Sequence, residues 1–281
     1  TGSYLPNNVL TNVDLEQKID TSDEWITKRT GIKRRHVITD NESTTQMAYQ
    51  AALGAIDSAD VQPDTIDMIV CASCTQDKVF PSLACLVQEK LGITCPAFDV
   101  QAACSGFIYG LSIADQYIKS GQAKRILLIG AEAMSKCLDW EDRATCVLFG
   151  DGAGAVILEA SETPGILSTH LAADGKYKEI LYVNNPDKPE DDAFLRMQGR
   201  EVFKLAVKYL GEIAEQAIEA SGLAASDVDW IVPHQANIRI IQATAKKLNI
   251  PMDRVIVTVQ DHANTSAASI PMALDTAIKS G

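Results

Sequence analysis

One segment organises the whole chain: Ala55-Ile-Asp-Ser-Ala-Asp-Val-Gln-Pro-Asp-Thr-Ile-Asp-Met-Ile-Val70 recurs later as Ala217-Ile-Glu-Ala-Ser-Gly-Leu-Ala-Ala-Ser-Asp-Val-Asp-Trp-Ile-Val232. Five aligned positions are identical, and most of the others keep their size or polarity. In each copy an amphipathic helix leads through a loop into a short apolar strand. Self-similarity of this kind is typical of a duplicated structural unit. We therefore expect two related α/β halves.

A shorter match extends the duplication and aligns three reactive side chains. The tetrapeptide Ile118–Gly121 recurs as Ile278–Gly281, and the same offset places Cys104 opposite Asn264. His234 comes directly after the second copy of the long repeat. Two halves packed by pseudo-twofold symmetry would bring a cysteine from one half to a histidine and an asparagine from the other.

Cys104 lies in the run Ala97-Phe-Asp-Val-Gln-Ala-Ala-Cys-Ser-Gly-Phe107, where an extended stretch changes abruptly into a helix. The first turn of a helix has unpaired N–H groups and the positive end of the macrodipole. Both favour a thiolate, so we expect the pKa of Cys104 to be lowered. A small buried core residue is the structural alternative, but the position at a helix start favours a functional cysteine.

Alternating apolar strands and helical patterns predict an α/β fold with largely parallel strands. The predicted strands are 66–71, 97–100, 125–130, 147–159, 166–173, 229–233 and 255–259. The predicted helices are 44–59, 82–91, 104–120, 200–221, 237–248 and 265–279.

The predicted halves are 1–164, which carries the cysteine, and 165–281, which carries the histidine and asparagine. Segment 1–6 is turn-rich, and 184–192 is typical of a surface loop. The second copy has no counterpart of the strands that follow Gly121 in the first. We therefore expect at least two C-terminal strands to be missing from this sequence.

Composition excludes several classes of function. A hydrophobic content of 46% over 281 residues is enough for a large core, and a net charge of −12 argues against general nucleic-acid binding. No apolar run is long enough to cross a bilayer, and no signal peptide is visible. Seven cysteines without regular spacing indicate a reducing compartment rather than a disulfide framework. We expect neither a nucleic-acid nor a membrane partner, and a cytoplasmic location.

A cysteine, a histidine and an asparagine on separate segments fit acyl transfer through a thioester. The thiolate attacks a carbonyl carbon, while imidazole and amide N–H groups stabilise the oxyanion or enolate. Each residue also has a structural alternative. His234 fits a satisfied polar residue at a strand end, and Asn264 fits a cap for the helix that follows it.

Two other motifs resemble known sites but are incomplete. Phe149-Gly-Asp-Gly-Ala-Gly-Ala155 lacks the lysine and spacing of a nucleotide-binding loop, so its glycines indicate close backbone approach. Cys71-Ala-Ser-Cys74 has no second ligand pair, which makes a metal or redox protein a remote alternative. We expect no metal site.

Four motifs together are more specific. The motifs are Thr21-Ser-Asp-Glu-Trp-Ile-Thr-Lys-Arg-Thr-Gly-Ile32, Phe149–Ala155, Val232-Pro-His-Gln-Ala-Asn237 and His262-Ala-Asn-Thr-Ser-Ala-Ala-Ser-Ile-Pro271. In this order they closely resemble the β-ketoacyl-[acyl carrier protein] synthase III family. The resemblance implies a thiolase-like fold with a duplicated five-layer αβαβα arrangement, and a homodimer. It implies an enzyme of bacterial cytoplasm or plastid stroma that starts type II fatty-acid synthesis and needs no cofactor.

The implied reaction is a decarboxylative Claisen condensation of an acyl-CoA, typically acetyl-CoA, with malonyl-[acyl carrier protein]. Carried over to this sequence, Cys104 is the nucleophile, and His234 and Asn264 bind the thioester carbonyl of the malonyl group. Related enzymes of the same fold are the alternatives: a polyketide-type or hydroxymethylglutaryl-type synthase, or a thioester hydrolase.

The resemblance also implies binding residues. Those for coenzyme A and substrate are Trp25, Arg29, Arg143, Phe203, Met197 and Asn237. On the residues alone, a structural role is favoured for Trp25 and a solvated one for Arg143. Phe80 matches a residue that reaches into the neighbouring subunit's acyl pocket.

Carrier docking is implied for a set of cations: Lys204, Arg239, Lys246 and Lys247. Arg200, Lys204 and Lys208 recur at helical spacing and form a basic stripe, which on the residues alone is more typical of plain solvated surface than of a docking site. Arg200 replaces the asparagine that the family pattern has there.

Overall fold

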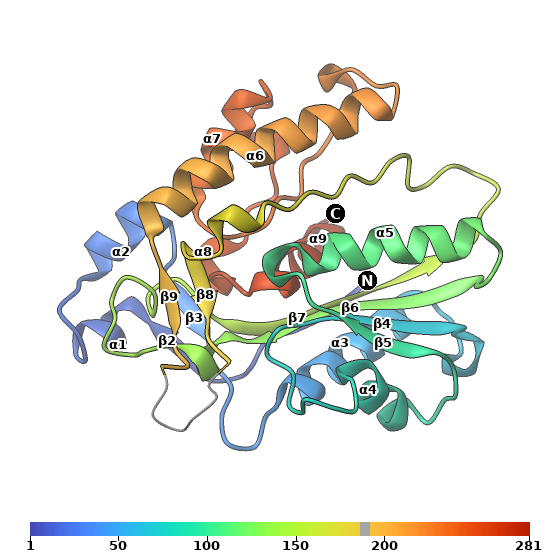
Figure 1. The fold of residues 1–281 in the computed structure, drawn as a ribbon, viewed down its shortest axis with the longest axis horizontal. Helices are drawn as coiled ribbons and strands as arrows, with labels where there is room; N and C mark the ends of the chain where they lie inside the picture. Colours follow the sequence, from blue (N-terminus) through green and yellow to red (C-terminus); the bar gives the residue numbers. More distant parts are fainter. Residues whose placement is uncertain (186–191) are drawn as a thin grey trace.

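A five-stranded sheet forms the centre of the molecule in the computed structural model, which describes residues 1–185 and 192–281 (Figure 1). The strand order is β1-β7-β6-β4-β5, in which β4, β5 and β6 are parallel and β7 runs antiparallel to both of its neighbours. The five strands are β1 (Gly2–Tyr4), β4 (Met68–Ala72), β5 (Ala97–Val100), β6 (Arg125–Ala133) and β7 (Asp151–Glu159).

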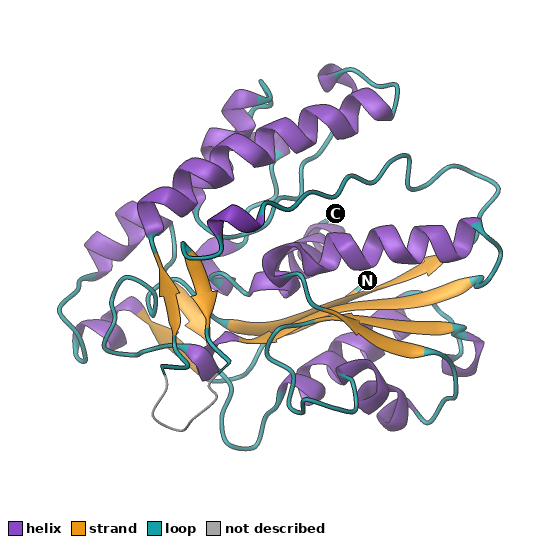
Figure 2. Ribbon diagram, viewed as in Figure 1, coloured by secondary structure: helices purple, strands orange, loops and turns teal. Residues whose placement is uncertain are grey.

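Helices cover both faces of this sheet (Figure 2). α3 (Thr44–Ser58) and α4 (Leu83–Leu91) lie on one face, and α5 (Gly106–Lys119) and α9 (Ser269–Ser280) lie on the other. Apolar side chains fill both interfaces, so β4 is buried at every position and β6 at all but its first. This layering fixes the carboxyl ends of β4, β5 and β6 at one edge of the sheet.

The remaining elements surround this core. α6 (Gly199–Ala220) and α7 (Ile238–Lys247) pack together beyond α5. The others are β2 (Val9–Thr11), α1 (Asn12–Glu16), α2 (Asp23–Thr30), β3 (Arg34–His36), β8 (Leu181–Val183), β9 (Leu195–Met197) and α8 (Val259–His262). No helix within 1–185 or 192–281 has the length and apolar character needed to cross a bilayer.

Backbone geometry repeats between the two copies. In each, a helix is followed by a 3₁₀ turn, η1 (Pro63–Thr65) or η5 (Ala225–Asp227), and then by extended chain. Ala103 and Ala263 both adopt positive φ, 45° and 58°, directly before the cysteine and the asparagine that the sequence aligned. A non-glycine residue in this region is uncommon, so its occurrence at two matching positions supports the duplication.

Two predicted strands of the second copy are wrong as continuous strands. Segments 229–233 and 255–259 are reduced to one parallel bridge, Ile231 with Val255. In the first copy, β4 has a neighbour on each side. The described part of the second copy has only the one bridge, with no strand on the other side of Ile231.

Other differences are local. The predicted strand 166–173 is a loop, held by side-chain contacts such as the hydrogen bond from Tyr109 Oη to the Ala172 carbonyl rather than by a strand ladder. The turn-rich segment 1–6 contains β1, which is too short for a periodic pattern and forms because β7 supplies its partner. Most of the predicted loop 184–192 lies outside the described residues.

The glycines of the 149–155 motif serve backbone packing, as the sequence predicted. A Cβ atom on Gly154 would lie 2.6 Å from the Met272 nitrogen, and one on Gly152 would lie 2.8 Å from the Met272 sulfur. Both distances are too short for a side chain. The motif therefore lets α9 approach β7 closely.

Candidate active site

Cys104 lies in the 3₁₀ turn η2 (Ala103–Ser105), which connects the end of β5 to the start of α5. It is half-buried, and its thiol interacts with the side chain of Ser266 from the second half of the chain. η2 packs directly against η7 (Ser266–Ala268). The duplication therefore brings corresponding turns of the two halves face to face.

The expected low pKa of this thiol is wrong. Burial raises the pKa of Cys104 to about 11; the interaction with Ser266 lowers it, and the nearby Glu132 carboxylate raises it. Desolvation of the thiolate therefore outweighs any benefit from the start of the helix. The sulfur needs a proton acceptor before it can act as a nucleophile.

Asn264 is anchored by its backbone to the segment before β7. Its N–H donates to the Leu148 carbonyl (2.9 Å), and its carbonyl accepts from the Gly150 N–H (3.1 Å). Its side-chain Oδ1 accepts from the Ser266 N–H (2.9 Å), whereas the N-cap residue of η7 is Thr265. Nδ2 has no hydrogen-bond partner in the described part of the chain, which leaves it as a donor for a ligand.

His234 follows the bridged residue Ile231 at the end of the extended segment. Its Nδ1 lies 2.5 Å from Ser269 Oγ, which also accepts from the Gln235 N–H (3.3 Å). Burial lowers the pKa of His234 to about 4, so the imidazole is neutral at pH 7. Because Ser269 Oγ already accepts one bond, its own proton can be donated to Nδ1. That arrangement leaves Nε2 as the N–H donor.

The three predicted reactive residues therefore converge on one short turn. Cys104 and Asn264 both contact Ser266, and His234 contacts Ser269, one residue beyond η7. The turn lies near the carboxyl ends of the parallel strands, where α/β folds commonly bind ligands. Sequence reasoning predicted the cluster, but not the two serines that hold it.

Gly130 of β6 sets the position of this turn. A Cβ atom there would lie 2.4 Å from the Ala267 carbonyl oxygen, which is a backbone atom and cannot rotate away. We expect Gly130→Ala to lower the free energy of unfolding by about 2 kcal/mol, because overpacked cores typically lose 1–3 kcal/mol. Urea denaturation measures this change. Gly165→Ala is the matched control, since a Cβ there has nothing within 4 Å, and an equal loss in both variants would contradict the explanation.

Trp25, Arg29 and Arg143 form a second cluster. The Arg29 and Arg143 guanidinium carbons lie 4.5 and 5.3 Å from the centroid of the Trp25 ring. Arg143 is oriented by Asp20, whose carbonyl oxygen accepts from Nη1 at 2.6 Å. The cluster presents flat cationic groups beside a half-buried aromatic face, a combination that suits stacking with a heterocycle.

The other residues matched to substrate binding are more dispersed. Met197 of β9 is half-buried and packs with the cluster around Leu138, whereas the Phe203 ring of α6 lies 5.5 Å from the Arg239 guanidinium carbon. Asn237 caps α7, with Oδ1 accepting from the Arg239 N–H (2.8 Å). Phe80 is 83% exposed.

The cations matched to carrier docking all lie exposed on α6 and α7, the two helices that pack together (Figure 1). Lys204 forms an ion pair with Glu201 at 2.9 Å. Lys247 Nζ donates to the Lys208 carbonyl, across the contact between the helices. The set is Lys204, Arg239, Lys246 and Lys247.

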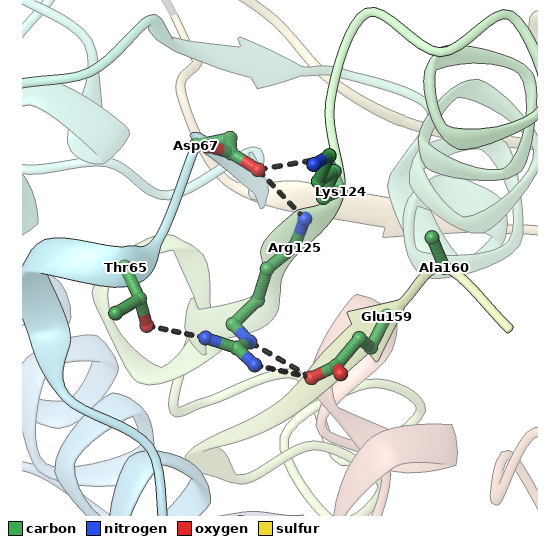
Figure 3. A pocket seen from close by; sticks show the side chains of 6 residues that line it. All are labelled: Thr65, Asp67, Lys124, Arg125, Glu159 and Ala160. Carbon is green, nitrogen blue, oxygen red and sulfur yellow. Dashed lines mark hydrogen bonds and ion pairs between the residues drawn. The ribbon is translucent and has the colours of Figure 1, made fainter.

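A hollow at the opposite end of the sheet is lined by polar groups that bond to one another (Figure 3). Asp67 accepts from the backbone N–H groups of Lys124 and Arg125, and the Arg125 guanidinium binds Glu159 and Thr65. These groups satisfy one another, which is typical of a structural clamp. The hollow is therefore not the candidate site.

Comparison with known proteins is consistent with this geometry. The family model described as 3-oxoacyl-[acyl-carrier-protein] synthase III matches residues 98–175, and its C-terminal counterpart matches 218–281. The β-ketoacyl-[acyl-carrier-protein] synthase III of Methylococcus capsulatus is 55% identical over 286 residues, covering 100% of this chain and 89% of the relative. The chain belongs to the β-ketoacyl-[acyl-carrier-protein] synthase III family.

Further members of the family agree. The β-ketoacyl-[acyl-carrier-protein] synthase III of Neisseria meningitidis is 58% identical, with coverage of 100% of this chain and 89% of the relative. The crystal structure of the synthase III from Aquifex aeolicus superposes with a TM-score of 0.96 at 53% identity, covering 100% of this chain and 89% of that one. The expected thiolase-like fold is confirmed. The chain is an acyl-transferring condensing enzyme of fatty-acid biosynthesis.

Proposed function

We propose that this β-ketoacyl-[acyl-carrier-protein] synthase III accepts the acyl group of an acyl-CoA on Cys104 and condenses it with malonyl-[acyl carrier protein]. The observation that carries the proposal is the convergence of Cys104, His234 and Asn264 around η7. Acetyl-CoA is the proposed typical primer. The reaction moves electron pairs only, and we propose that it needs no cofactor.

In the first half-reaction, the Cys104 thiolate attacks the acyl-CoA carbonyl carbon, the bond from that carbon to the coenzyme A sulfur breaks, and coenzyme A leaves as its thiolate. Trp25 and Arg143, with Arg29 beside them, would hold the adenine ring by stacking, which suits the geometry of that cluster. Met197, Phe203 and Asn237 would line the route of the pantetheine arm. A covalent acyl-enzyme divides one difficult substitution into two easier ones.

In the second half-reaction, malonyl-[acyl carrier protein] loses carbon dioxide. The electron pair of the broken C–C bond moves toward the thioester carbonyl, where negative charge develops on oxygen. His234 Nε2 and Asn264 Nδ2 would donate to this oxygen, and a preorganised donor is worth about 3 kcal/mol. The carbanion then attacks the acyl carbonyl, and Cys104 leaves as the thiolate with release of the 3-oxoacyl product.

Partners follow from charge and exposure. The carrier protein would dock on the basic surface formed by Lys204, Arg239, Lys246 and Lys247. This chain has a net charge of −12, so a local basic surface is what would attract an acidic carrier protein to it. The exposed Phe80 supports a homodimer in which this ring enters the partner's acyl pocket.

We propose that the two halves of the chain are residues 1–164 and residues 165–281. For location we propose bacterial cytoplasm, supported by bacterial relatives, with plastid stroma as the alternative.

Mass spectrometry of the acylated enzyme tests the proposal. Incubation with acetyl-CoA is expected to add one acetyl group, mapped to the Cys104 peptide, and malonyl-[acyl carrier protein] is expected to discharge it as 3-oxoacyl product. Malonyl-CoA is the matched control acceptor and should be far less effective. Discharge to water alone would favour a thioester hydrolase, and equal use of malonyl-CoA would favour a synthase that acts on coenzyme A. Acetylation of Cys71 or Cys74 instead would contradict the role of Cys104.

A further inference from the structure

Glu132 is a buried carboxylate that the proposed reaction does not use. It lies at the carboxyl end of β6 and is 0% exposed. No lysine, arginine or histidine pairs with it among the described residues. Burying an ionised carboxylate without a counter-ion is energetically costly. Such a group near a reactive centre is a candidate for function.

Hydrogen-bond donors surround this carboxylate. On one side it accepts from Thr75 Oγ1 (2.6 Å) and the Cys74 N–H (3.2 Å), with Ser73 Oγ at 3.5 Å. Cys74 Sγ lies 3.3 Å from Oε1. On the side toward the active site, Oε1 accepts from Ser266 Oγ at 3.1 Å. Ser266 is itself only 2% exposed.

Ser266 connects the carboxylate to the reactive thiol. Its hydroxyl donates to Glu132 at 3.1 Å, and its turn, η7, packs against the turn η2 that carries Cys104. The Cys104 thiol interacts with the Ser266 side chain. A serine hydroxyl has one proton, so while it donates to Glu132 its lone pairs can accept the S–H of Cys104. Ser266 is therefore placed to pass a proton from the sulfur to the carboxylate.

We propose that Glu132, acting through Ser266, accepts the proton that Cys104 loses when its thiolate forms. The S–H proton passes to Ser266 Oγ while the Ser266 hydroxyl proton passes to Glu132 Oε1. The S–H and O–H bonds break, new O–H bonds form on Ser266 and Glu132, and no proton enters or leaves the site. Ser266 touches the reacting atom, whereas Glu132 is a positioning residue that acts through it.

Charge balance favours this route over loss of the proton to solvent. Direct ionisation of Cys104 would place two negative charges in one buried site, and the Glu132 carboxylate already raises the pKa of the thiol. Transfer within the network keeps one negative charge before and after the step. Burial also raises the pKa of Glu132, which makes the carboxylate a better proton acceptor than an exposed glutamate.

The other titratable groups near the network are thiols. Cys74 follows β4 and Cys137 ends the 3₁₀ turn η3 (Met134–Cys137), and both sense the charge of Glu132. Burial raises the pKa of both thiols, as it does for Cys104, so the thiols are told apart by reading the alkylation of each peptide separately. A pH profile measured at Cys104 therefore reports on the relay from Cys104 through Ser266 to Glu132.

The test is the rate of Cys104 alkylation by iodoacetamide as a function of pH, read on the Cys104 peptide by mass spectrometry. In the native enzyme we expect a nearly flat rate from about pH 6 to pH 9, because the proton moves inside the network rather than to solvent. In Glu132→Gln, which keeps shape but cannot accept the proton, the rate should rise about tenfold per pH unit.

Ser266→Ala tests the same relay without altering the carboxylate. If Glu132→Gln fails to fold, this variant alone tests whether the Cys104 proton passes through Ser266. We expect it to give the steep profile. Ser73→Ala is the matched control, because Ser73 is also a buried serine facing Glu132 but is not among the groups that interact with the Cys104 thiol. Its profile should stay flat. Flat profiles in both Glu132→Gln and Ser266→Ala, or a steep one in Ser73→Ala, would overturn the proposal.

The proton relay matters for catalysis only if Cys104 is the nucleophile, so it rests on the proposed function. The relay and the proposed function can nevertheless be refuted separately. Alkylation is measured without coenzyme A or carrier protein, so a failed relay leaves acetylation of Cys104 intact. A Cys104 that is never acetylated would instead refute the proposed function, whatever its alkylation profile.

Discussion

Cys104→Ser is expected to abolish acyl-enzyme formation and to lower the condensation rate by on the order of 10⁴-fold or more. A serine hydroxyl is a far weaker acid than a thiol, and Glu132 is a carboxylate too weakly basic to ionise it. Substrate binding should be little changed, because oxygen replaces sulfur without altering the surrounding contacts. Intact-mass analysis after mixing with acetyl-CoA measures the first effect, and product formation from malonyl-[acyl carrier protein] measures the second.

Cys85→Ser is the matched control for this prediction. Cys85 is also a half-buried free cysteine, but it lies in α4 on the opposite face of the sheet, with Sγ 3.6 Å from the Ala97 carbonyl oxygen. We expect this variant to keep wild-type acylation and condensation. Activity of Cys104→Ser within tenfold of the native enzyme would rule out Cys104 as the nucleophile.

The parts of the site that the sequence predicted are those that repeat or that follow a regular element. The offset between the two copies paired Cys104 with Asn264, and the structure places their turns in contact. His234 was predicted from its place after an apolar segment. Such inferences succeed because periodicity and duplication are properties of the chain itself, independent of how distant segments pack.

The parts that the sequence did not predict depend on tertiary packing. The pKa of Cys104 was expected from its helix terminus, yet burial and the neighbouring Glu132 decide it. In the sequence, Glu132 is an acidic residue that follows Ile129-Gly-Ala131. Its neighbours in the chain do not indicate that it is buried without a counter-ion. The local signal that was available was its place directly after the apolar run 126–131, which indicates burial but not the lack of a counter-ion.

Short strands illustrate the same limit. β1 has three residues, which is too few for an alternating pattern, and it forms by pairing with β7 more than a hundred residues away. Conversely, 166–173 and 229–233 carry apolar residues typical of strands but have too few neighbours to form a ladder. A strand needs a partner, and partners are set by topology rather than by local sequence.

His234→Ala and Asn264→Ala are each expected to lower condensation by about 10²–10³-fold while leaving acylation of Cys104 nearly intact. Each removes one N–H donor from the oxygen on which charge develops as carbon dioxide leaves, whereas the attack of Cys104 on acyl-CoA does not use these donors. Release of labelled carbon dioxide from malonyl-[acyl carrier protein] measures the step directly, and intact mass measures acylation in the same samples.

Two further variants separate catalysis from folding in this experiment. Ser269→Ala keeps the imidazole but removes the hydroxyl that contacts Nδ1, so both tautomers become accessible and a smaller loss of decarboxylation is expected. His170→Ala is the matched control, because His170 lies in the loop between β7 and β8 and has no hydrogen bond to Ser266 or Ser269 among the described residues. If His234→Ala lost acylation and decarboxylation equally, its role would be to hold the site together rather than to stabilise the enolate. An unequal loss, with acylation retained, identifies donation to the enolate oxygen as the function of the imidazole, because a general collapse of the site would remove both half-reactions together.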